Sequence, residues 1–268
     1  MLKDITLGQY FPGNSIIHLL DPRTKLIMLV VYIVALFMAT GWVAYGVLFA
    51  ALVWVIRVST IPVKSIIKGM KPLVVILIFT GLLNLFFTQE GKLLVDVWVI
   101  QIYSGGVSRA AMMVARILML ITCTFLLTYT TSPIALTDGL EALRNPLKKG
   151  GGPVHELSMM MCIALRFIPT LIEETDKIMR AQKARCADFE NGSLIERAKA
   201  LIPILVPLFI SAFRRADELA TAMECRCYQG GEGRTKMKLL RYHREDLISI
   251  GLGAMLVPAG IILANFGL

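Results

Sequence analysis

Long apolar runs separated by short polar segments occupy the first half of this 268-residue chain, and one more lies near its end. A transmembrane helix needs roughly 20 mainly apolar residues, with about 17 at the lower limit. The pattern therefore predicts an all-α membrane protein with about five transmembrane helices, the first two forming a hairpin at Thr40-Gly41. The runs are residues 26–38, 42–56, 72–87, 110–129 and 247–266.

Basic residues gather before the first run and between the second and third, whereas residues 88–108 carry no basic excess. Because Lys and Arg accumulate in cytoplasmic loops, the N-terminus and the long segment 132–245 are expected inside the cell and the C-terminus outside. The basic residues concerned are Lys3, Arg23, Lys25, Arg57, Lys64, Lys68 and Lys71.

Composition narrows the class further. Hydrophobic residues make up 56% of the chain and the mean hydropathy is +0.68, above what a soluble domain of this size requires. The net charge of +9 suggests basic loops at a membrane, because no basic tract is interleaved with aromatics as a nucleic-acid partner would require. The five cysteines lack the spacing of a disulfide framework.

The long polar segment predicts amphipathic helices. Ser132-Pro133 marks the start of a short helix ending near Asn145-Pro146, and residues 155–186 form either one helix or two joined near Pro169. A capping box at Ser193-Glu196 begins another helix, which we expect to end at Gly230-Gly231. The chain thus divides into a membrane domain (1–131), a cytoplasmic domain of long amphipathic helices (132–245) and a C-terminal transmembrane helix (246–268).

The two long amphipathic helices end in the same pattern. Asp176 lies nine residues before Arg185, and Asp217 lies nine residues before Arg226; a cysteine follows each arginine. A guanidinium with five fixed donors between small neighbours suits insertion into a partner's groove. The alternative is that each arginine only complements a helix dipole at its C-terminus.

Several other sequence patterns give little support for a nucleotide-binding, metal-binding or catalytic site. No P-loop occurs, so the chain cannot hold ATP phosphates in that manner. Cys225 and Cys227 lack the further ligands of a metal site, and Met159-Met160-Met161 is typical of adaptable packing. Arg116 lies inside the fourth apolar run and should face protein or a water-filled cavity.

Three motifs resemble the transmembrane T component of energy-coupling factor transporters. They are residues 11–26 (beginning Phe-Pro-Gly-Asn), residues 153–175 (beginning Pro-Val-His-Glu) and residues 212–220 (Ala-Phe-Arg-Arg-Ala-Asp-Glu-Leu-Ala). The family also carries two short Arg motifs, usually Ala-Arg-Gly. They correspond here to Ala184-Arg185-Cys186 and Cys225-Arg226-Cys227, with cysteine in place of glycine.

This resemblance implies a non-catalytic scaffold. Its coupling helices would dock two ABC-type ATPases through Arg185 and Arg226 and contact a membrane-embedded, substrate-binding S component. ATP and Mg²⁺ would be used by the ATPases, with no cofactor bound by this chain, and vitamin uptake is the expected process. Membrane lipid completes the expected partners. The expected S-component contacts are Leu157, Met161, Ile168, Leu205 and Phe209.

Three rival interpretations remain. The nearest is the T subunit of a dedicated cobalt or nickel importer, which shares these motifs. A conventional ABC permease usually presents one short coupling helix, unlike the two long helices expected here. A membrane-embedded enzyme would have to use His155-Glu156 or Asp217-Glu218, neither of which has a nucleophile or a second ligand beside it.

Overall fold

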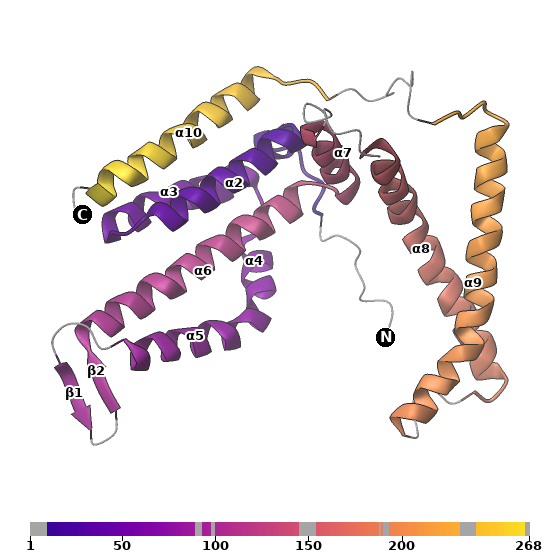
Figure 1. The fold of residues 1–268 in the computed structure, drawn as a ribbon, viewed down its shortest axis with the longest axis horizontal. Coiled ribbons are helices and arrows are strands. Elements are labelled where there is room, and N and C mark those ends of the chain that lie inside the picture. Colours follow the sequence, from indigo (N-terminus) through magenta and orange to yellow (C-terminus); the bar gives the residue numbers. More distant parts are fainter. Residues whose placement is uncertain are drawn as a thin grey trace. The chain divides into compact units, whose positions relative to one another are not determined.

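The computed structural model describes residues 10–88, 93–97, 100–144, 154–187, 189, 193–230 and 240–265. It confirms an all-α membrane protein (Figure 1). The helices are α1 (Ile16–Leu19), α2 (Pro22–Met38), α3 (Trp42–Ser59), α4 (Val63–Met70), α5 (Val74–Phe87), α6 (Ser104–Thr130), α7 (Pro133–Arg144), α8 (Val154–Ala184), α9 (Leu194–Glu224) and α10 (Arg244–Asn265).

Two compact units make up the fold. Among the described residues, the membrane unit covers positions 10–140 and 240–265, and the helix-pair unit covers positions 141–230. In the membrane unit α2 packs against α10 and α6, α3 also packs against α6 and α10, and α5 packs along α6 (Figure 1). A core of Tyr32, Leu36, Leu48 and Met119 joins α2, α3 and α6.

Within the described residues, three helical stretches are long and apolar enough to cross a membrane: Trp42–Ser59, Val63–Phe87 and Ser104–Thr130. These correspond to the second, third and fourth predicted runs. Helix α2 has 17 residues and α10 begins with Arg-Glu-Asp. The predicted count of five spans therefore stays a prediction.

The basic segment between the second and third predicted runs contains helix α4. Thr60 takes a left-handed conformation (φ 56°) that ends α3, and Pro62 separates the two helices. Ile66 is buried against Leu126 and Tyr129, which anchors α4 across the end of α6. Its two lysines, Lys64 and Lys68, remain exposed, as does Lys71 directly after the helix.

Residues 88–108, expected as a loop, include an antiparallel hairpin. Strand β1 (Leu93–Val97) pairs with β2 (Ile100–Tyr103) between α5 and α6 (Figure 1). The sequence analysis missed it because both strands are short. The signal was present in the β-branched residues and in the alternation of Ile-Gln-Ile-Tyr.

The partner of Arg116 is the hairpin between α2 and α3. Its Nε donates to the Tyr45 hydroxyl at 2.7 Å and its Nη2 donates to the Ala39 carbonyl at 3.3 Å. The guanidinium also lies over the rings of Phe37 (5.6 Å) and Tyr45 (5.7 Å). Ala39 is the C-cap of α2, so Arg116 supplies a positive charge and a donor to a helix C-terminus.

Arg116→Met will therefore loosen the hairpin. Losing hydrogen bonds from a charged donor should lower the free energy of unfolding by about 2–3 kcal/mol. Thermal unfolding of the purified protein in detergent measures this, with Arg57→Met as a control because Arg57 is exposed at the end of α3. Equal melting temperatures for the two variants would show that the contacts with Ala39 and Tyr45 contribute nothing.

A second polar contact joins the two ends of the chain. Asp246 is 1% exposed; its Oδ1 accepts from the backbone N–H of Asp21 at 2.9 Å and its Oδ2 from that of His243 at 2.8 Å. The Asp21 side chain in turn caps α2 by accepting from the Arg23 N–H. One buried carboxylate thus holds the start of α10 against the start of α2.

Candidate docking site

The helix-pair unit consists mainly of α8 and α9, each of 31 residues. Helix α8 is continuous through Pro169, so the alternative of two helices joined there is wrong. Helix α9 begins with the predicted capping box: the Ser193 hydroxyl accepts from the Glu196 N–H, and Glu196 accepts from the Ser193 N–H. Pro203 and Pro207 both lie inside α9.

Polar contacts between α8 and α9 run in antiparallel order. Glu174 on α8 accepts from the Ser211 hydroxyl and from Arg215 Nη2 at 2.9 Å on α9. The Ser211 hydrogen bond, followed by that from Arg215, lowers the pKa of Glu174 below its usual range. Toward the end of α8, Gln182 Nε2 donates to the Pro203 carbonyl at 3.4 Å. These contacts fix how the two helices lie against each other.

The two Arg motifs have the same backbone geometry. After α8, the N–H of Cys186 donates to the Lys183 carbonyl and that of Ala187 to Gln182. After α9, the N–H of Cys227 donates to the Glu224 carbonyl and that of Tyr228 to Met223. This pair of bonds is the Schellman ending, and in both cases the arginine is the last residue before the left-handed position.

Cysteine, not glycine, occupies the left-handed position in both motifs. Cys186 has φ 64° and Cys227 has φ 55°. The expectation that α9 ends at Gly230-Gly231 is therefore wrong: the helix ends at Glu224, and the left-handed Cys227 completes its ending. Sequence reasoning chose the glycines because a left-handed cysteine is strained, a cost of roughly 1–2 kcal/mol.

Replacing both cysteines with glycine should consequently stabilise the helix ends. Cys186→Gly with Cys227→Gly is expected to add about 0.5–1 kcal/mol per site, since relief of the left-handed strain exceeds the entropy cost of glycine. Chemical unfolding measures the gain. The matched control, Cys186→Ala with Cys227→Ala, removes the thiols but keeps Cβ, and an equal gain there would rule out backbone strain as the cause.

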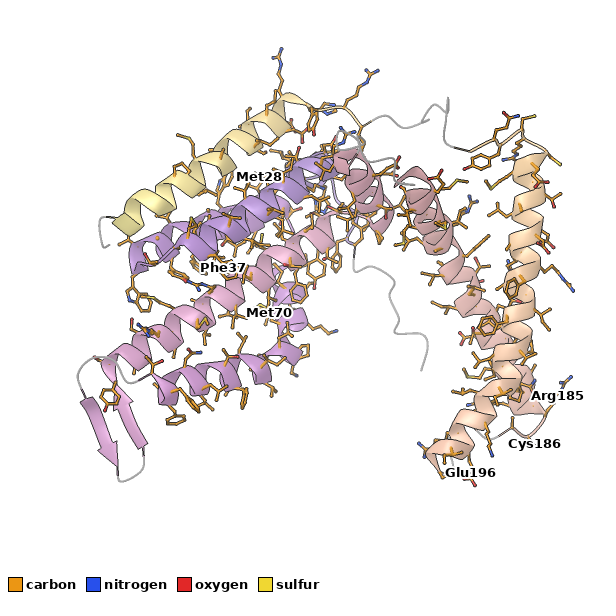
Figure 2. The ribbon with its side chains drawn as sticks, in the orientation of Figure 1. Met28, Phe37, Met70, Arg185, Cys186 and Glu196 are labelled. Atoms are coloured by element: carbon orange, nitrogen blue, oxygen red, sulfur yellow. The ribbon has the colours of Figure 1, made fainter. Side chains whose placement is uncertain are left out.

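The motifs are exposed and far apart. All six residues are exposed: Ala184, Arg185, Cys186, Cys225, Arg226 and Cys227. Figure 2 shows Arg185 and Cys186 beside Glu196 in the first turn of α9. Arg226 follows the last turn of that helix, about 45 Å away at 1.5 Å per residue.

The residues expected to contact an S component lie mostly on open surface. Leu157, Met161, Leu205 and Phe209 are exposed and Ile168 is half-buried. The exposed apolar surface of α9 is wider than the sequence analysis proposed. It also includes Leu201, Ile202, Val206, Ile210 and Phe213.

Neither a metal cluster nor a disulfide is found among the residues that the structure describes. The fold thus defines a helical membrane protein carrying a separate helix pair with two exposed Arg motifs.

Comparison with known proteins assigns this class to a family. A family profile described as CbiQ, cobalt transport protein, matches residues 13–237. A protein of Thermosediminibacter oceani named energy-coupling factor transporter transmembrane protein EcfT is 50% identical over 265 residues, 99% of both chains. Proteins of the same name from Heliobacterium modesticaldum (52% over 246 residues, 92% of both chains) and Bacillus subtilis (48% over 246 residues, 92% of this chain and 93% of the relative) are similar as well.

The chain therefore belongs to the CbiQ family and, within it, to the EcfT transmembrane proteins of energy-coupling factor transporters. The resemblance inferred from the three sequence motifs is confirmed.

Proposed function

We propose that this chain is the scaffold that couples ATP hydrolysis by two cytoplasmic ABC-type ATPases to movement of a membrane-embedded S component. The observation that carries the proposal is the repetition of one Arg-bearing helix ending at Arg185 and at Arg226. Two copies of a docking element about one helix length apart suit two ATPase subunits, one motif for each. A macrodipole role alone would not require the same left-handed turn twice.

The helix pair would then transmit movement of the ATPases to the S component. Closure of the ATPases on ATP would move the two Arg motifs and with them α8 and α9, whose relative position is fixed by Glu174, Ser211 and Arg215. The exposed apolar face around Leu205 and Phe209 is suited to gripping an equally apolar S component. Movement of this apolar face would reorient the S component so that the substrate bound to the S component faces inward.

This chain would contribute no catalysis of its own. It lacks a P-loop, so ATP and Mg²⁺ belong to the ATPases. We place the N-terminus and the helix pair in the cytoplasm of the cell that carries the transporter in its plasma membrane. The basic residues near the start of α2 and on α4 support this orientation, because they collect at one end of the membrane unit.

Vitamin or micronutrient uptake is the substrate class that we favour, because the relatives at about 50% identity carry the energy-coupling factor name. The alternative is the T subunit of a dedicated cobalt or nickel importer. The matching family profile, described as a cobalt transport protein, is the observation in its favour.

Affinity purification distinguishes the two proposed functions. The tagged chain would be extracted from its own membranes in mild detergent and its companions identified by mass spectrometry. Two different ABC ATPases with small apolar membrane proteins are expected. One ATPase type with a metal-binding membrane protein would favour the cobalt or nickel importer, and the absence of any ATPase would refute the scaffold.

A further inference from the structure

The membrane unit contains an apolar cavity of about 350 Å³ between α1, α2, α3, α6 and α10. This volume lies in the range of small-ligand pockets, roughly 300–1,000 Å³. Its walls are mostly aliphatic, with Met28, Leu52, Leu127 and Leu256 among them. Met28 lies between α2 and α10 (Figure 2), and a side chain at Gly253 would overlap its sulfur, so the two helices approach closely beside the cavity.

One end of this cavity is polar. Thr24 and Lys25 from the start of α2, Thr130 from the end of α6, and Glu245 and Ser249 from the start of α10 contribute to its wall. These helix termini belong to the end of the unit where basic residues such as Arg23 and Arg244 also lie. The cavity therefore has the polarity of an amphiphile, with a polar end near the membrane surface and an apolar remainder.

The polar end holds unused hydrogen-bonding capacity. Thr24 is 1% exposed, and its hydroxyl has no partner among the described residues. The ammonium of Lys25, 9% exposed, donates to the carbonyls of His18 (3.2 Å) and Thr130 (3.0 Å), which leaves one of its three donors available. A buried hydroxyl without a partner is costly unless something bonds to it.

We propose that this cavity binds one membrane phospholipid, with an acyl chain in the apolar part and an ester carbonyl accepting from Thr24 and Lys25. An ester carbonyl supplies a neutral acceptor for the Thr24 hydroxyl, which has no partner among the described residues. A charged headgroup is not required there, because Lys25 already interacts with Asp21 and Asp246. The lipid would fill the space that separates α1, α3 and α6 from α10, and it would stabilise the attachment of α10.

Native mass spectrometry tests the site. The full-length chain would be delipidated in detergent, given palmitoyl-oleoyl-phosphatidylglycerol, and the bound lipids counted. Leu127→Trp, which fills the cavity, should abolish the tightest-binding lipid. The matched control is Leu118→Trp, which fills a second apolar hollow between α5 and α6 whose lining residues are all apolar; it should retain that lipid.

Thr24→Val keeps the shape of the side chain and removes the hydroxyl, so it separates loss of binding from loss of folding. Lipid affinity should fall about 2- to 10-fold, the range that one hydrogen bond supplies. Size-exclusion chromatography verifies that each variant is folded. Equal lipid retention by Leu127→Trp and the wild type would overturn the proposal, as would unchanged affinity in Thr24→Val. Preferential binding of free palmitate over the phospholipid would overturn the choice of ligand.

Discussion

On the proposed function, reversing the charge of both arginines, Arg185→Glu with Arg226→Glu, will leave the protein in the membrane but uncouple it from the proposed ATPase partners. Both side chains are exposed at helix ends and the membrane unit does not depend on them. In the proposed ATPase groove, a glutamate in place of the guanidinium would meet like charges, which costs on the order of several kcal/mol. ATP-dependent uptake should therefore fall by more than about tenfold. Uptake of labelled substrate into cells measures the loss of transport. Co-purification of the ATPases measures the loss of ATPase binding.

Single variants test each Arg motif separately. If each motif serves one ATPase, Arg185→Glu and Arg226→Glu should each weaken retention of a different ATPase. Arg197→Glu is a suitable control, because Arg197 is exposed near the start of α9, at the same end of the helix pair as Arg185. Full uptake by the double variant would refute the docking assignment. If Arg197→Glu lost as much ATPase binding as Arg185→Glu, the loss would be a general effect of charge and not of the Arg motif.

Asp246→Ala should cause the largest loss of stability in the membrane unit. The substitution leaves the N–H groups of Asp21 and His243 without their acceptor and removes a carboxylate that interacts with the buried ammonium of Lys25. Breaking a buried charged contact by deleting one partner typically costs about 3–5 kcal/mol. We expect a markedly lower melting temperature and release of α10 from α2, measured by limited proteolysis between the helix-pair unit and α10.

Two further variants separate charge from hydrogen bonding. Asp246→Asn keeps one acceptor oxygen, so it should lose less stability than Asp246→Ala. Glu245→Ala serves as the control, because Glu245 is the exposed neighbour on the same turn. If Asp246→Ala and Glu245→Ala had the same melting temperature, the contact between Asp246 and the start of α2 would be unimportant for stability.

Local patterns predicted the helices of this protein well. The capping signals at Ser132-Pro133 and Ser193-Glu196 start α7 and α9 as expected, since a cap depends on residues within one turn. The apolar runs located α3, α5, α6 and α10 because burial in a bilayer requires apolar side chains along the whole helix. The β-hairpin and α4 were missed, as both are short elements held by their neighbours.

The candidate docking site was predicted in part for the same reason. The repeated spacing around Arg185 and Arg226 is a local property, so the sequence alone indicated two similar helix ends. That cysteine adopts the left-handed position could not be inferred, because intrinsic preference favours glycine there. The docking role and the apolar contact surface remain predictions for the experiments above.

The sequence by itself determined the class of protein, the long helices with the caps that start α7 and α9, and the two Arg motifs, because each depends on residues close together in the chain. Only the tertiary structure decided which groups hydrogen-bond to Arg116 and how Asp246 joins α10 to α2. It also placed Thr24, which has no partner in the described part of the chain, beside a cavity. Those contacts join residues up to 225 positions apart. Their physical cause is the need of buried polar groups for partners, and packing alone determines which partners come within reach.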